Sequence, residues 1–354
     1  MRYLPFTHAS HFLKERDFGQ KIEASFDFIR AHFKPLGRAL LMIVLPAALV
    51  IGLATALMTL EWINNLKGLQ GSAATVDKTN PWPGISNVFS KMFFSPAYLT
   101  IVFGGLILTT MLILTVYGYV TLRLETAPEQ EITVSAVWRL VRQRFLGTVG
   151  ALIGLGVGSM IVFFLVSMVA GVLSALLIGG SGGSRFMIGV AVVLVMSLVF
   201  GAFAYISIAL SLFLIIWVRE RLGFLATISR SFKLIWGKWW STFGLLIVML
   251  IISGVIILAI TLLTSLISSP FAAATAGTDG LEGAARLSFL VATTLRSMAS
   301  LVIYPLILLA LAFQYFNLVE RKEGESLHYL VDAIGQPAPE AAPQALRPDD
   351  EGEY

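Results

Sequence analysis

Six long apolar stretches divide the chain and dominate its hydrophobic pattern. An α-helix needs roughly 20 consecutive apolar residues to cross a bilayer, and each stretch meets that length. The third and fourth stretches carry no charge over 33 residues each. At about 1.5 Å per residue each would be roughly 50 Å long, so each is predicted to form one tilted or protruding helix. The six predicted spans are residues 39–62, 97–122, 146–178, 186–218, 240–269 and 287–317.

A stripe of large apolar residues precedes the first, third and fifth spans. Its steps of three and four residues place these side chains on one face of a helix. Two spans follow each stripe, so we interpret the chain as three parallel repeats of one amphipathic helix plus two spans. Alternatively, basic amphipathic helices before spans only follow the charge rule of membrane proteins. The stripes are Phe18, Ile22, Phe26, Ile29 and Phe33; Val134, Trp138, Val141 and Phe145; and Phe224, Ile228, Phe232, Ile235 and Trp239.

The predicted fold is therefore an all-α integral membrane protein with six transmembrane helices and three amphipathic helices at the cytoplasmic interface. Its membrane domain covers residues 18–335, with repeats over about 18–122, 134–218 and 224–317 and then a short cytoplasmic helix. A polar cytoplasmic segment, residues 1–17, precedes this domain. Residues 336–354 are rich in proline and acidic residues, and we expect them to be disordered.

Composition and charge support a membrane protein and orient it. Apolar residues make up 57% and charged residues 13%, against about 25% charged in ordinary soluble domains. Of the 25 lysines and arginines, 19 fall at the two chain ends and in the second and fourth loops, which places both termini in the cytoplasm. The net charge of +4 is thus a topology signal and does not indicate nucleic-acid binding. Because cysteine is absent, disulfides and thiol chemistry are excluded.

Three sets of residues are candidate sites. Cations that flank the stripes are predicted to bind anionic lipid headgroups, unless they only fix topology during insertion. Arg296 in the sixth span and Glu61 at the end of the first form a candidate intramembrane polar site, although Arg296 can instead reach the outer interface alone. Small residues in the third span predict close helix packing, within the chain, with a second copy or around a lipid. The headgroup candidates are Arg30, Lys34, Arg139, Arg142, Lys233 and Lys238, and the small residues are Gly150, Gly154 and Gly158.

No arrangement of nucleophile, base or metal ligands points to catalysis. His8 and His11 lack a third ligand, so we predict no metal site, and no cofactor is implied. The first hypothesis is a non-enzymatic multi-pass membrane module that organises lipids or partner envelope proteins. The alternative is a transporter or lipid-translocating protein, which would need a polar cavity. An intramembrane enzyme acting on lipid is a third hypothesis.

Three sequence runs carry a family resemblance: RDFGQKI at residues 16–22, SFKLIWGKWW at 231–240 and QYFNLVER at 314–321. They resemble uncharacterised bacterial integral membrane proteins related to the membrane domain of glycerophosphoryl diester phosphodiesterases. The resemblance covers most of residues 12–335. It implies a six-helix module of the bacterial inner membrane whose partners are lipids, anionic ones among them, and other envelope proteins or a second copy. It implies no catalytic residue, because this chain has no room for the soluble catalytic barrel of the phosphodiesterases.

Overall fold

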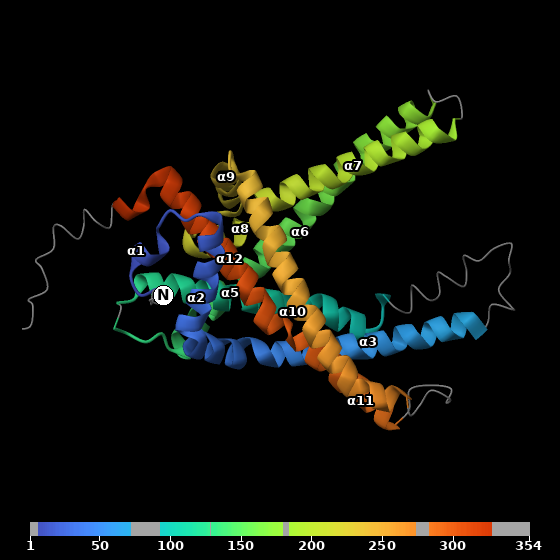
Figure 1. Ribbon diagram of the computed structural model, residues 1–354, viewed down its shortest axis with the longest axis horizontal. Coiled ribbons are helices and arrows are strands. Elements are labelled where there is room, and N and C mark those ends of the chain that lie inside the picture. The colour runs from blue at the N-terminus through green and yellow to red at the C-terminus, as the bar shows by residue number, and fades with distance from the viewer. Residues whose placement is uncertain (1–5, 72–92, 128, 180–183, 274–282, 328–354) are drawn as a thin grey trace, which may run out of the picture.

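The computed structural model describes residues 6–71, 93–127, 129–179, 184–273 and 283–327 (Figure 1). This part of the chain is α-helical and contains no β-strand. One π-helical turn, η1, interrupts the first long helix. The elements are α1 (Ala9–Phe12), α2 (Phe18–Ala39), η1 (Leu40–Val44), α3 (Leu45–Gly71), α5 (Pro96–Glu125), α6 (Val134–Gly179), α7 (Arg185–Ala209), α8 (Phe213–Arg219), α9 (Phe224–Ile235), α10 (Trp239–Ala273), α11 (Gly283–Met298) and α12 (Ser300–Glu323).

Six helical stretches in the described residues are long and apolar enough to cross a membrane. This confirms the predicted all-α class and the six apolar helices. The predicted disordered tail, 336–354, lies outside the described residues. The six stretches are Phe18–Ile63, Pro96–Glu125, Val134–Gly179, Arg185–Arg219, Trp239–Leu266 and Arg286–Glu323.

The helices form two arms that meet at one end (Figure 1). One arm is the α6–α7 hairpin, which extends away from the rest of the molecule. The other arm contains α3, α5, α10 and α11, and α12 passes through the centre of the junction. The most apolar part of the stretch Arg286–Glu323, which contains α11 and α12, is 69% buried. The most apolar parts of α6 and of α7–α8 are only 6% buried. The hairpin surface is therefore apolar and largely uncovered by the chain itself.

The junction of the two arms holds an aromatic core that includes the N-terminal segment. Phe6 and Phe12 are buried against Phe28 of α2 and Phe313 of α12, with ring centroids 5.3–6.2 Å apart. Arg16 lies beside them; its backbone N–H donates to Asn317 Oδ1 at 2.8 Å, and burial lowers its pKa to about 10. The polar segment predicted over residues 1–17 is thus packed into the core over its described part, residues 6–17.

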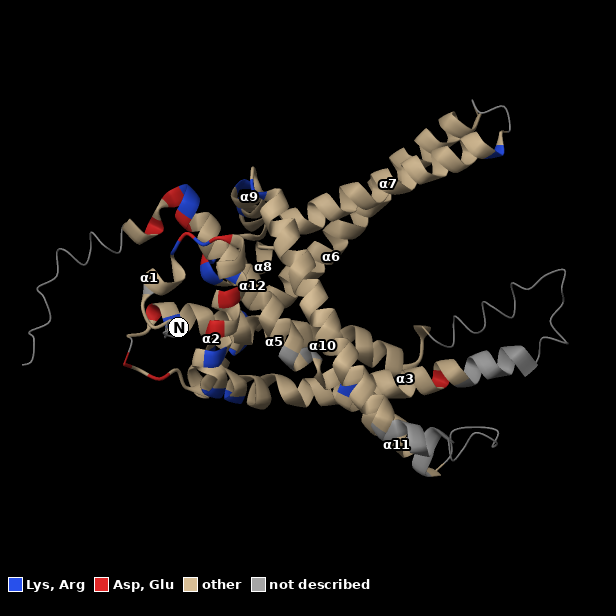
Figure 2. Ribbon diagram, viewed as in Figure 1, with Lys and Arg blue, Asp and Glu red and all other residues tan. Residues whose placement is uncertain are grey.

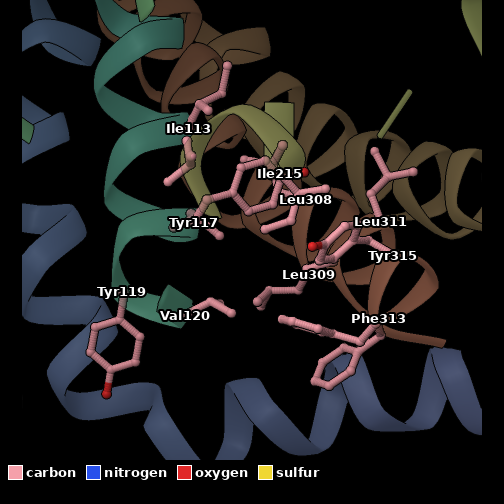
Figure 3. Close-up of a cluster of buried hydrophobic side chains, with 14 of the residues drawn as sticks. Ile113, Tyr117, Tyr119, Val120, Ile215, Leu308, Leu309, Leu311, Phe313 and Tyr315 are labelled. Carbon is pink, nitrogen blue, oxygen red and sulfur yellow. The ribbon is translucent and has the colours of Figure 1, made fainter. Parts of the chain in front are cut away.

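Helix α2 buries a different face from the predicted stripe. Its buried positions include Ala24, Ser25, Phe28 and His32, while Phe18 and Phe33 of the stripe are exposed. The Tyr119 hydroxyl lies 3.0 Å from His32 Nδ1, and Figure 3 shows Tyr119 pointing away from the central cluster of Tyr117, Ile215 and Leu308. The core side of α2 thus combines small and polar residues with Phe28, and only the two ends of the stripe face outward.

The proline at position 35 bends α2. His32 has a non-helical backbone (φ −112°, ψ 19°), three residues before Pro35. A proline ring clashes with the carbonyl of the fourth preceding residue and removes one hydrogen bond, which accounts for this kink. A second proline, Pro46, lies in the first turn of α3, directly after the π-helical turn η1.

Two predicted spans are broken where no glycine or proline marks a break. The fourth is interrupted between α7 and α8, and the Ser231 hydroxyl donates to the freed Ala209 carbonyl at 2.6 Å. The sixth is interrupted at Ala299, and Pro305 lies inside α12. Each of these two stretches is still long and apolar enough to cross a membrane.

The three amphipathic segments are connected to their spans in three ways. Segment 18–34 lies within α2 and is separated from α3 by η1. Segment 134–145 is the beginning of α6, one continuous helix of 46 residues. The third stripe lies mainly in α9, which ends at a turn where Gly237 has φ +79° before α10 begins. A threefold repeat of these units stays a prediction.

Candidate functional site

Charged side chains gather where the two arms meet. Figure 2 shows lysine, arginine, aspartate and glutamate concentrated around α2, α9 and the C-terminal part of α12, whereas the α6–α7 hairpin is nearly free of them. We call this region the charged end. It follows from the sequence, because the charged segments are the parts of the chain between and beside the apolar stretches.

Five of the six predicted headgroup cations have uncommitted side chains. All six are exposed. Arg30 lies 3.8 Å from Asp27. Within the described part of the chain, no hydrogen bond or ion pair holds the side chains of the other five: Lys34, Arg139, Arg142, Lys233 and Lys238.

Neighbouring cations at the charged end have structural roles instead. Arg123 donates to the carbonyls of Gln130 and Ala127 at 2.9 and 2.7 Å. Arg144 donates to the carbonyls of Trp217 and Val218 at the end of α8. The sequence did not separate these two arginines from Arg139 and Arg142, because the partners are backbone carbonyls brought close only by folding.

Two tryptophans lie beside two of the uncommitted lysines. Trp236 and Trp240 are 75% and 76% exposed, and they flank the turn between α9 and α10 that carries Lys238, with Lys233 one turn earlier. We call these four residues the Trp–Lys surface. A cavity of about 290 Å³, lined partly by Trp236, opens next to it. Exposed tryptophans and basic residues are typical of the boundary between hydrocarbon and water in membrane proteins.

The Trp–Lys surface is held in place from α12. Lys322 Nζ donates to the carbonyls of Lys233 and Trp236 at 2.7 and 2.9 Å, which satisfies the free carbonyl end of α9. Lys21 Nζ donates to Ser241 Oγ at 3.2 Å. Lys238 lies close enough to both lysines to repel them, so positive potential is concentrated here. Such a surface favours an anion.

An ionic network joins α8, α9 and α12 on a neighbouring part of the charged end. Arg230 Nε lies 2.9 Å from Glu220 Oε2, and both side chains are 19% exposed. Arg230 also binds Glu323 through both terminal nitrogens, and Tyr315 donates to Glu220 at 2.7 Å. The hydrogen bonds from Arg230 to Glu323 are the main cause that raises the Arg230 pKa. The network was not predicted from the sequence, because it requires the end of α12 to reach α9.

A second candidate site is a cavity inside the apolar arm. It has a volume of about 960 Å³ and is lined by residues of α3, α5, α8, α10, α11 and α12. Its lining is mostly apolar, and among the described residues Arg296 is the one charged residue in it. The cavity was not predicted from sequence, although Arg296 was singled out.

Glu61 does not join this site. Arg296 lies on α11 and Glu61 on α3, and both are exposed. In the described residues no ion pair links them. The two helices do pack closely, because a Cβ at Gly52 of α3 would lie 2.4 Å from Ser297 Oγ and 3.2 Å from the Thr294 carbonyl of α11.

The predicted small-residue series makes one close contact. A Cβ at Gly154 would lie 2.9 Å from the Phe224 ring, so this glycine allows α9 to pack on α6. At Gly150 and Gly158 a Cβ would meet open space. These two positions lie on the part of α6 that the chain leaves uncovered.

No protein-family model matches this chain, and no curated protein or solved structure has significant similarity to it. The suggested relationship to the membrane domain of glycerophosphoryl diester phosphodiesterases is therefore supported only by the three sequence runs that suggested it.

Proposed function

We propose that this chain is a non-enzymatic multi-pass module of a bacterial inner membrane that holds anionic lipid at its charged end. The Trp–Lys surface is the observation that carries this proposal. It combines exposed aromatic rings, which favour the headgroup region, with lysine side chains that form no hydrogen bond or ion pair in the described structure. A lipid phosphate would pair with these lysines.

The proposed orientation puts the charged end and both termini in the cytoplasm, as the positive-inside rule requires. Segments 18–34, 134–145 and 224–239 would then lie at the cytoplasmic interface as three related amphipathic helices. Arg30, Lys34, Arg139 and Arg142 would add headgroup contacts to those of the Trp–Lys surface. Lipid, a partner envelope protein or a second copy would cover the apolar surface of the α6–α7 hairpin, including Gly158.

A double substitution tests the headgroup contact. Lys233→Gln with Lys238→Gln removes two charges without removing a hydrogen bond of either side chain to the described structure. Each cation near an anionic leaflet contributes about 1 kcal/mol, so the affinity for phosphatidylglycerol should fall roughly 30-fold. Lipid that co-purifies in mild detergent is counted per chain by mass spectrometry.

The matched control removes two exposed cations from the opposite end of the helices, Arg185→Gln with Arg286→Gln. We expect it to retain phosphatidylglycerol like the wild type. If the lysine double variant keeps its topology and retains as much phosphatidylglycerol as the wild type and the control, these lysines act only in membrane insertion.

A transporter or lipid-translocating protein is the second candidate function. The feature that favours it is the cavity of about 960 Å³ with a cation in its lining. A transport function predicts movement of a fluorescent lipid between leaflets of vesicles containing the purified chain, whereas a static lipid-holding module leaves the rate at that of empty vesicles.

A further inference from the structure

We infer that the cavity in the apolar arm is a binding site for one anionic amphiphile, with its acidic headgroup on Arg296 and its chain along α10. This inference deepens the proposed function, since it rests on a lipid-holding membrane module and names a second, separate lipid site. The volume of about 960 Å³ lies at the upper end of the roughly 300–1,000 Å³ typical of small-molecule sites.

The charge of Arg296 selects the headgroup. Among the described residues, no acidic residue lines the cavity, and the Arg296 side chain forms no hydrogen bond or ion pair. An arginine within a membrane-spanning segment raises the free energy of the folded protein unless an anion pairs with its charge or water hydrates it. Its planar guanidinium matches a carboxylate or a phosphate with two parallel hydrogen bonds.

A buried serine adds a polar group to the wall of the cavity. Ser253 of α10 lines the cavity and is 3% exposed, and its hydroxyl has no hydrogen-bond partner in the described residues. Hydroxyls in apolar helices usually donate to a preceding carbonyl, as Thr264 does to Ile260 at 2.9 Å. The hydroxyls of Thr115, Tyr117 and Thr294 are also unpartnered, so Arg296 and not Ser253 determines which ligand the cavity takes.

The shape of the cavity suits a hydrocarbon chain of one leaflet. Its lining follows α10 from Leu250 to Thr261, which at about 1.5 Å per residue is roughly 16 Å. This is about half of a 30 Å hydrocarbon core. The apolar lining includes Leu108, Ile257 and Leu308.

The position of Arg296 places the headgroup at the far boundary of the membrane. Arg296 lies before the start of α12, and the length of α12 from Ser300 to Glu320, near the charged end, is about 30 Å at 1.5 Å per residue. That length is close to the thickness of the hydrocarbon core. The ligand therefore belongs to the leaflet opposite the charged end, and its site is distinct from the Trp–Lys surface.

Titration of delipidated full-length protein tests the inference. The probes are oleate, dioleoyl-phosphatidylglycerol and the uncharged oleyl alcohol, counted by native mass spectrometry. We expect one anionic molecule per chain and much weaker binding of oleyl alcohol. Binding of oleate alone identifies a free fatty acid, and binding of phosphatidylglycerol identifies a membrane phospholipid. Failure of both anions to bind, or equal binding of the alcohol, overturns the inference.

Two kinds of variant locate the site. Arg296→Gln should weaken binding about 10- to 100-fold, whereas Arg286→Gln on the same helix should not. Gly254→Phe and, as a second filling variant, Gly105→Phe add a ring at cavity-lining positions where a Cβ meets open space, and should abolish binding. Gly158→Phe, outside the cavity and equally unhindered, is their control.

The results separate this inference from the proposed function. Lys233→Gln with Lys238→Gln should leave the cavity ligand bound at wild-type affinity. Wild-type binding by Arg296→Gln, or by both filling variants, removes the cavity site and leaves the Trp–Lys surface untouched. Loss of co-purified lipid only in the lysine variant supports the proposed function alone.

Discussion

The ionic network around Arg230 gives a quantitative prediction for the stability of the charged end. Arg230→Met removes the guanidinium that binds Glu220 of the α8–α9 connection and Glu323 of α12. The two carboxylates then face each other with Tyr315 as the remaining donor to Glu220. The helices α8, α9 and α12 lose the contact that ties their ends together.

The magnitude follows from how far each contact is buried. Hydrogen bonds to charged groups contribute about 1.5–3 kcal/mol, and the Arg230–Glu220 contact, with both side chains 19% exposed, falls in that range. Glu323 is 39% exposed, so we discount its contact to about 1 kcal/mol. The expected loss of unfolding free energy is about 3 kcal/mol, at the lower end of the roughly 3–5 kcal/mol lost when one partner of a fully buried pair is removed.

The assay is equilibrium unfolding in mixed micelles of increasing sodium dodecyl sulfate, followed by tryptophan fluorescence. Arg221→Met is the matched control, because Arg221 lies 3.9 Å from Glu125 with side chains 61% and 56% exposed. Such a pair contributes under about 1 kcal/mol. Arg230→Lys, which keeps the charge but loses the fork, should fall between the two. If Arg230→Met lowers the free energy of unfolding no more than Arg221→Met does, the network does not stabilise the junction.

Two further predictions concern packing. Phe12→Ala should lower the free energy of unfolding by about 3–5 kcal/mol in the same assay, because Phe12 is fully buried among aromatic rings. Phe33→Ala, at a 69% exposed position, should lower it far less. Equal losses would mean that the N-terminal segment is not part of the core. Gly52→Leu should lower the free energy of unfolding by about 1–3 kcal/mol and displace α11, which is measured by cysteine crosslinking between α3 and α11. Gly254→Ala should leave stability unchanged or raise it. Unchanged crosslinking in Gly52→Leu would contradict the close approach of the two helices.

Hydropathy determined the class of this protein because a bilayer imposes one strong condition on the chain. Backbone groups inside hydrocarbon must bond within their own segment, so long apolar stretches become helices. Residues 97–122 were predicted as a span, and α5 extends over Pro96–Glu125. The clustering of charge at one end follows from the same pattern, because charged residues occur between the spans.

The inner face of each helix was not readable from hydropathy. Lipid is as apolar as a leucine side chain, so large apolar residues gain little by turning inward, and small or polar residues form the contacts between helices. In α2, Ala24, Ser25 and His32 lie inside together with Phe28. The predicted stripe correctly identified a helical period, but its middle residues are only partly buried and its two ends, Phe18 and Phe33, are exposed.

Only the tertiary structure decided which polar groups are free to bind something. The sequence marked Arg142 and Arg144 alike, yet Arg144 caps α8 while Arg142 stays exposed. It predicted Arg296 as an intramembrane cation but did not predict the cavity, whose walls come from six helices. Composition and period are local properties, whereas a site is made by side chains that meet only when the helices pack.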